Sequence, residues 1–289
     1  MKTARMIYYL IAILIAAGIP QLVHARGDVT HRSESVDAKG AKRIEAEIKY
    51  GAGKLSVEPS AMSEAAKMDI MYSVPSRDYD LDYELSGDVG MLTFETNTRH
   101  IRGDIDTDNN RLDVTLSDKY PTDLTLEVGA CDAQIDLGGL RLTQLKIEVG
   151  ASAGDISFSR PNPERMREFG IEAGAASVNF SSLGNANFEH MKFEGGVGKF
   201  RIDLRGEYHG ESEIDMEIGL GAATIVLPDD VPVRILADKD NWLSSVDFHS
   251  HQLEEVEEGV YESPGFDQAK TRIILKLEVG LGSADIRWR

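Results

Sequence analysis

Leu145-Lys-Ile-Glu-Val-Gly-Ala-Ser-Ala-Gly-Asp-Ile-Ser-Phe158 is the stretch of this 289-residue chain that decides its fold. Apolar residues alternate with polar ones on both sides of a turn of small residues, which is the pattern of two short β-strands joined at a corner. The same frame recurs around six glutamates: Glu127, Glu148, Glu172, Glu194, Glu217 and Glu278. The first five glutamates lie 21, 24, 22 and 23 residues apart, and a repeat of this length is typical of solenoids.

The residues around each glutamate predict which side of the strand is buried. Three residues before the glutamates stand Leu124, Leu145, Phe169, Met191, Ile214 and Leu275. Because side chains alternate along a strand, this apolar column points inward and the glutamates point to solvent. Neither strand of a repeat buries its apolar side alone, but stacked repeats do. We therefore expect an all-β fold, a β-solenoid of stacked two-strand repeats of about 22 residues, with an irregular N-terminal β-region.

The chain divides into four expected parts. Residues 1–25 have a basic start, an apolar run over 7–19 and a small-residue site, which are the features of a signal peptide. Residues 26–42 are expected to be a linker, 43–118 the N-terminal β-region, and 119–289 the solenoid repeats, with a loop excursion at about 249–269. Membrane association through an uncleaved N-terminal segment stays open as an alternative.

Two imperfect repeats are expected to extend the stack. One is centred on Glu47, with inward residues from Ile44 to Val57, and the other has Arg234 at the glutamate position. Stacked carboxylates about 4.8 Å apart repel by roughly 0.9 kcal/mol in water. A cation relieves that repulsion, so we expect Arg234 to lie near Glu217 or Glu278. Lysines two residues before three of the glutamates should act in the same way, namely Lys146, Lys192 and Lys276.

Charge and cysteine content limit the possible partners and the source of stability. The formal net charge is −18, which argues against nucleic acid and anionic lipid surfaces as partners. Cys131 is the single cysteine of the chain, so no internal disulfide forms and stability depends on packing.

Three stretches resemble the toast-rack proteins and the related C-terminal domain of LiaF-type cell-envelope-stress proteins. The first is Glu45-Ala-Glu-Ile-Lys-Tyr-Gly-Ala-Gly-Lys-Leu-Ser-Val57. The second comprises residues 110–116, 121–129 and 136–140, and the third comprises residues 261–273, which lead into 279–283. The resemblance implies an envelope-associated β-solenoid without known catalysis, and LiaF-type proteins modulate a stress-sensing kinase. This chain lacks their several N-terminal membrane helices, which puts direct kinase regulation in doubt.

An acidic stretch offers a candidate metal site. Asp104, Asp106 and Asp108 alternate as the oxygen ligands of a calcium loop do. The expected glycine and the final acidic ligand are replaced by Asn109 and Thr115, so a solvated acidic loop is the competing interpretation. No other cofactor is indicated.

The outward residues of the second strands form a candidate binding surface, which we call the polar ridge. Its members are Gln134, Asp136, Asp155, Ser157, Ser177, Asn179, Arg201, Asp203, Thr224 and Asp285. Solenoid faces bind extended polymers, and Asp136, Asp155, Arg201 and Asp203 are the residues expected to contact a ligand. Solvent exposure alone would also make such a column polar.

These features predict an exported, non-catalytic module that binds or scaffolds an envelope protein or a glycan, in the periplasm or associated with the cell envelope. A surface adhesin is the second hypothesis. A glycan-active enzyme is the third, and it would need Asp155, Asp203 or Asp285 in a cleft with a perturbed pKa.

Overall fold

The computed structural model describes residues 29–72, 79–96, 110–237, 244–249 and 252–289. The predicted signal peptide lies outside them. The strands are β1 Thr30–Val36, β2 Arg43–Ser60, β3 Ala66–Tyr72, β4 Tyr79–Ser86, β5 Val89–Thr96, β6 Arg111–Ser117, β7 Pro121–Asp136, β8 Arg141–Val149, β9 Ala153–Ser157, β10 Met166–Ser181, β11 Phe188–Asp203, β12 Glu211–Leu227, β13 Val233–Ala237, β14 Ser244–His249, β15 Glu254–Glu257, β16 Val260–Glu262 and β17 Arg272–Trp288. Two short 3-10 helices, η2 Leu183–Ala186 and η3 Phe266–Gln268, complete the described elements.

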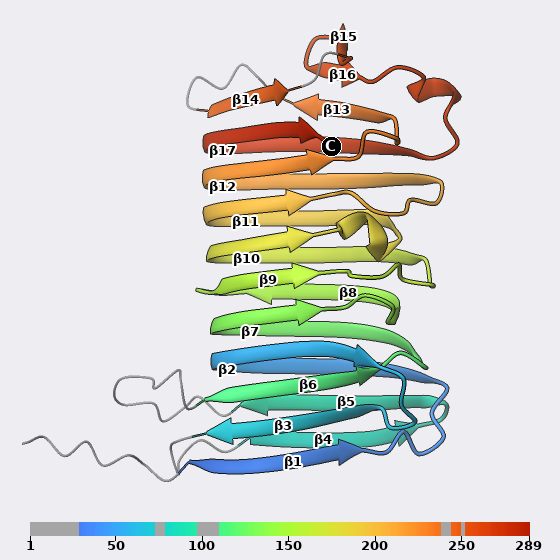
Figure 1. Cartoon of the computed structure of the whole chain (residues 1–289), viewed down its shortest axis with the longest axis vertical. Helices are drawn as coiled ribbons and strands as arrows, with labels where there is room; N and C mark the ends of the chain where they lie inside the picture. Colours follow the sequence, from blue (N-terminus) through green and yellow to red (C-terminus); the bar gives the residue numbers. More distant parts are fainter. Residues whose placement is uncertain (1–28, 73–78, 97–109, 238–243, 250–251) are drawn as a thin grey trace, which may run out of the picture.

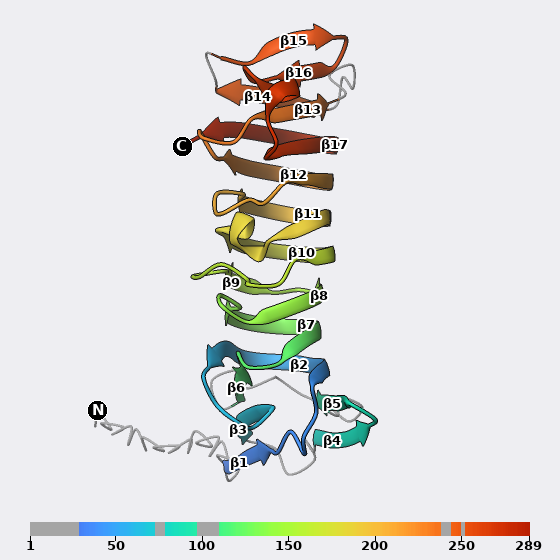
Figure 2. The ribbon, with the colours of Figure 1, turned by 90° about the vertical axis from the view of Figure 1, so that its right-hand side faces the viewer.

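The middle of the molecule is a stack of parallel two-strand rungs, which confirms the expected all-β solenoid (Figure 1). Each long strand, such as β11, bends at a corner, so that its first half belongs to one sheet and its second half to the other (Figure 1 and Figure 2). The β8–β9 rung divides the same path between two strands. We call the outward side of the first halves the glutamate face and the outward side of the second halves the ridge face.

The core lies between the two sheets and is filled by side chains that alternate inward along each strand. Phe169 contacts Phe158 and Phe188 edge to face, with ring centroids 5.9 and 5.8 Å apart. Phe193 packs in the same way between Phe180 and Phe200, with both centroid distances at 5.5 Å. These aromatic stacks bridge successive rungs, so that each rung buries the apolar side of its neighbours.

The order of the rungs in space differs from their order in the chain at both ends. β17 pairs with β12 on one side and with β13 and β14 on the other, so the last strand of the chain is inserted beneath an earlier rung. Near the N-terminus, β2 pairs with β7 on one side and with β5 and β6 on the other. Towards both ends of the stack, therefore, neighbouring rungs are formed by segments that are not neighbours in the sequence.

The N-terminal region adds antiparallel strands to the stack, and it corrects the expected linker over 26–42. β1 lies within that segment and pairs antiparallel with β3, while β3 pairs antiparallel with β6 and β4 with β5. Of the residues in β1, Val36 alone is buried. The strand is held by backbone pairing, which leaves no hydrophobic pattern in the sequence.

The register of β2 corrects the predicted repeat around Glu47. Lys49, and not Glu47, pairs with Glu127, so the true alignment is shifted by two residues. A shift by an even number keeps every inward side chain inward, and the hydrophobic pattern alone does not detect it.

The prediction that Arg234 lies near Glu217 or Glu278 is wrong. β13 pairs with β17 in a register that places Arg234 beside Ile274, four residues before Glu278. The Arg234 guanidinium binds Glu262, at 2.6 Å, and Asp267, at 3.3 Å. The same guanidinium lies over the ring of Phe266, with the Arg234 Cζ atom 4.3 Å from the ring centroid. Arg234 therefore fastens the excursion at about 249–269, in which β15 and β16 form a hairpin, to the C-terminal end of the stack.

Among the described residues, no helix has the length and apolar character needed to cross a membrane.

Candidate functional site

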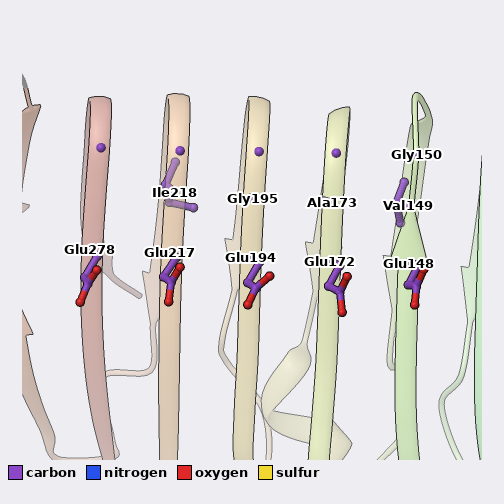
Figure 3. A pocket seen from close by; sticks show the side chains of 14 residues that line it. Glu148, Val149, Gly150, Glu172, Ala173, Glu194, Gly195, Glu217, Ile218 and Glu278 are labelled. Atoms are coloured by element: carbon purple, nitrogen blue, oxygen red, sulfur yellow. The ribbon is translucent and has the colours of Figure 1, made fainter.

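The glutamate face carries a continuous ladder of carboxylates, as the repeat predicted. Direct pairing aligns the six glutamates in one column, in the order Glu127, Glu148, Glu172, Glu194, Glu217 and Glu278. Five of them, from Glu148 to Glu278, stand side by side in Figure 3. We call these six residues the glutamate ladder.

Lysines offset the repulsion along part of the ladder. Lys49 ends the column beside Glu127, at 2.9 Å, and also binds Glu47, at 2.8 Å. Lys146 bridges Glu148, at 2.5 Å, and Glu172, at 3.2 Å. Hydrogen bonds from Lys49 to Glu127 and Glu47 raise the pKa of the lysine.

The C-terminal part of the ladder is less well neutralised. Lys192 binds Glu194, as expected. Lys276, which was expected to serve Glu278, instead binds Glu213 and Asp215 of the adjacent β12. Within the described part of the chain, no lysine or arginine forms an ion pair with Glu217 or Glu278.

A shallow groove of about 570 Å³ runs along the ladder. The glutamates form one side, and its floor is a column of glycines: Gly150, Gly174, Gly196, Gly219 and Gly280. A Cβ atom on Gly196, Gly219 or Gly280 would lie 2.7 Å from the carbonyl oxygen of the glycine one rung below. Close approach of the corners therefore requires glycine at these positions, and the groove is a consequence of that packing.

The ridge face aligns most of the predicted polar ridge in one column. Pairing places Gln134, Asp155, Asn179, Arg201, Thr224 and Asp285 next to one another on successive rungs. The column continues to Asp247 at one end and through Ser56, Asp113 and Asp69 to Ser33 at the other. An unbroken line of hydrogen-bonding groups therefore follows the long axis of the molecule.

Asp155 and Arg201, two of the four predicted contact residues, both lie in this column. Asp155 accepts hydrogen bonds from Gln134 on one side, at 3.3 Å, and from Asn179 on the other, at 2.9 Å. Asn179 pairs with Arg201 on the next strand, and the Arg201 side chain is exposed. The three rungs present a carboxylate, an amide and a guanidinium in sequence.

Asp136 and Asp203, the other two predicted contact residues, lie two residues further along their strands and hold turns. Asp136 accepts hydrogen bonds from the backbone N–H groups of Gly138 and Ser159. Asp203 is buried and accepts hydrogen bonds from the Arg205 guanidinium at 2.6 and 2.8 Å. Burial works against the charged form of Asp203, but the bonds from Arg205 outweigh it and lower the pKa.

The candidate calcium ligands Asp104, Asp106 and Asp108 lie outside the described residues. In the part of the chain that the structure describes, no three His, Cys, Asp or Glu side chains are grouped as metal ligands.

Residues 25–181 match the family model of the N-terminal domain of toast_rack, DUF2154. The match covers more than half of the chain, and the protein belongs to the toast-rack family. No curated protein matches the chain in sequence.

Solved structures are similar to the chain at low sequence identity. A candidate cell adhesion protein from Clostridium sporogenes is 18% identical, covers 91% of this chain and 100% of its own, and has a TM-score of 0.48. A candidate adhesin from Bacteroides fragilis is 11% identical, covers 91% of this chain and 97% of its own, with a TM-score of 0.39. A candidate lipid-binding protein from Parabacteroides distasonis is 12% identical, covers 91% of this chain and 97% of its own, and has a TM-score of 0.34.

Proposed function

We propose that this toast-rack protein is a non-catalytic binding module of the cell envelope that holds an extended polar ligand, a glycan or a protein segment, along its ridge face. The observation that carries the proposal is the unbroken column through Asp155, Asn179 and Arg201. Its groups repeat every rung, about 4.8 Å, so a long ligand lying along the stack meets a donor or acceptor at each step.

Ionisation on the ridge face supports binding over glycan cleavage. A glycosidase needs one carboxyl group whose pKa is raised, so that it can donate a proton at neutral pH. Asp203 and Asp285 have the opposite property. Hydrogen bonds from Arg287 lower the pKa of Asp285, and Arg205 does the same for Asp203. Both stay anionic and are suited to accept hydrogen bonds.

A glycan screen paired with a pull-down from envelope extracts tests the proposal. The ridge variant carries Asp155→Ala, Asn179→Ala and Arg201→Ala. A matched control carries Thr125→Ala and Gln144→Ala on the glutamate face. We expect the unmodified protein and the control to retain the same ligand and the ridge variant to lose it. Equal retention by the ridge variant, or no ligand for the unmodified protein, would contradict the proposal.

Export to the envelope, the surface-adhesin alternative and a role in envelope stress are further parts of the proposal that need tests in cells. Protease added to intact cells degrades an adhesin exposed at the surface and spares a periplasmic protein. A change in envelope-stress signalling on deletion of the gene, restored by the unmodified chain and not by the ridge variant, would support the stress role.

A further inference from the structure

Three exposed aliphatic side chains align at the corner beside the groove of the glutamate ladder. They are Val197, Leu220 and Leu281, which are 53, 48 and 44% exposed. Direct strand pairing places them next to one another on β11, β12 and β17. Each follows a glycine of the groove floor in sequence, so the column lies one residue beyond the floor. We call these three residues the apolar column.

The corner geometry does not require large side chains at these positions. On β10 the residue that pairs with Val197 is Ala175. Isolated exposed leucines are common in proteins, but a contiguous apolar column on adjacent rungs is typical of an interaction surface.

Two of the three rungs of the apolar column carry Glu217 and Glu278, with which no lysine or arginine of the described residues forms an ion pair. β12 presents Glu217 and Leu220, and β17 presents Glu278 and Leu281, three residues apart in each strand. Three residues of strand span at most about 10 Å, which is close to the diameter of an α-helix with its side chains. A helix lying over the glycine floor would therefore contact the carboxylates with one flank and the aliphatic side chains with the other.

The spacing along the stack fits the same partner. Rungs repeat about every 4.8 Å, and one turn of an α-helix rises about 5.4 Å. Side chains at i, i+3 or i+4 and i+7 of such a helix therefore meet successive rungs over the three rungs of the apolar column.

From this match we propose that the corner groove binds a cationic amphipathic helix of a partner polypeptide, which lies along the solenoid axis. Its lysines or arginines face the glutamate ladder, and its apolar stripe covers Val197, Leu220 and Leu281. Charge selects this occupant over the alternatives. A second copy of this chain would bring its own glutamate ladder and a net charge of −18, and an anionic membrane surface would also be repelled.

The experiment measures binding of a synthetic helical peptide to the full-length protein by fluorescence anisotropy. The peptide has about 14 residues, long enough to span the rungs from Glu148 to Glu278, with adjacent leucine and lysine stripes. A scrambled peptide of the same composition has no contiguous stripes. We expect the striped peptide to bind more tightly than the scrambled one, and its affinity to fall as salt is raised.

Two double variants separate the contributions of charge and apolar contact. Glu217→Gln with Glu278→Gln should weaken binding by about 3- to 10-fold. Leu220→Ala with Leu281→Ala should weaken it by about 10-fold, since alanine already occupies this column at Ala175 and the fold tolerates it. The control replaces exposed apolar residues elsewhere, Leu85→Ala with Val256→Ala, and should bind as the unmodified protein does.

Several results would overturn the proposal. They are equal binding of both peptides, unchanged affinity of the leucine double variant, no binding at low salt, or self-association that the leucine variant abolishes. The ridge variant described above should bind the striped peptide normally, so failure of the ridge proposal and failure of this one are distinguishable.

Discussion

Lys49 and Asp203 show how single charged residues hold the stack at places where the repeat alone would be unstable. Lys49 interrupts the acidic column by binding Glu47 and Glu127. Asp203 fixes the turn after β11 through its ion pair with Arg205, and its side chain is only 9% exposed. Lys49 balances charge between rungs, whereas the Asp203 carboxylate is a buried acceptor that the Arg205 guanidinium satisfies.

Replacing Lys49 by methionine leaves two carboxylates on adjacent strands without their shared cation. We expect the free energy of unfolding to fall by about 0.5 to 1 kcal/mol in urea titrations at low salt. Lys199→Met, on the exposed ridge face, is the control. The pKa of Lys49 is raised in the folded state. The stabilisation of the folded state by Lys49 is therefore complete at neutral pH and is lost only as pH rises through the folded-state pKa. A larger loss for the Lys199 variant would refute this role.

Asp203→Asn removes a buried charge from its Arg205 partner and should cost about 1.5 to 3 kcal/mol at pH 7. The pKa of Asp203 is lowered in the folded state. The stabilisation by Asp203 is therefore complete above its unfolded-state pKa and is lost as pH falls through the folded-state value. Stability measured from pH 7 to pH 2 should thus decline less steeply in the variant. Asp229→Asn, an exposed substitution, should leave the profile of the unmodified chain intact.

At the scale of the rung, the corner glycines decide how closely neighbouring rungs approach, and their positions in the sequence mark where each strand bends. The alternation, the corners and the glutamate ladder are all visible in the sequence because each is a local pattern. The registers of Lys49 and Arg234 are not, because shifts of two and four residues preserve the alternation. β1 is missed for a different reason, namely that backbone pairing leaves no apolar signature.

A substitution at Gly221 tests the corner directly, and a substitution at Gly170, away from the corner, is the comparison. Gly221 has a φ of +139°, and a Cβ atom there would overlap the carbonyl oxygen of Gly198, so Gly221→Ala should destabilise the protein by about 3 kcal/mol. Gly170 lies inside β10, where the nearest atom to an added Cβ, Lys146 Cγ, is 3.9 Å away. Gly170→Ala should therefore stabilise by about 0.5 to 1 kcal/mol. Denaturant unfolding of both variants measures the difference, and equal effects would contradict the account.

Over the whole molecule, the sequence does not specify the order of rungs, because pairing partners depend on the path of the connections. The separation of 61 positions between Glu217 and Glu278 suggests rungs far apart, yet the structure pairs these two glutamates directly. The ridge column was predicted in part, since Asp155, Asn179 and Arg201 have a clear outward position in each repeat. Its extension to Ser33 and Asp247 depends on the end strands, whose registers require the structure.

Deletions test the insertion of β17. A chain in which residues 228–271 are replaced by a seven-residue link, like residues 204–210 between β11 and β12, keeps β17 beside β12. It should unfold cooperatively but self-associate through the uncovered edge of β17. A chain truncated after residue 271 removes β17, the parallel partner of both β13 and β14, and should be much less stable. Circular dichroism melting compares them, and a truncated chain as stable as the full one would exclude this order.

The alignment of the glutamate ladder is tested most directly by one distance. Spin labels at Glu127→Cys and Glu278→Cys, in a Cys131→Ser background, should be separated by five rung spacings, about 24 Å between their backbones. Cys131 is replaced by serine because Ser152 holds the matching place on the next rung. A single narrow distribution by pulsed electron paramagnetic resonance near this value, allowing for the label arms, is the predicted result. A broad distribution, or a separation far beyond it, would contradict a column of glutamates on successive rungs.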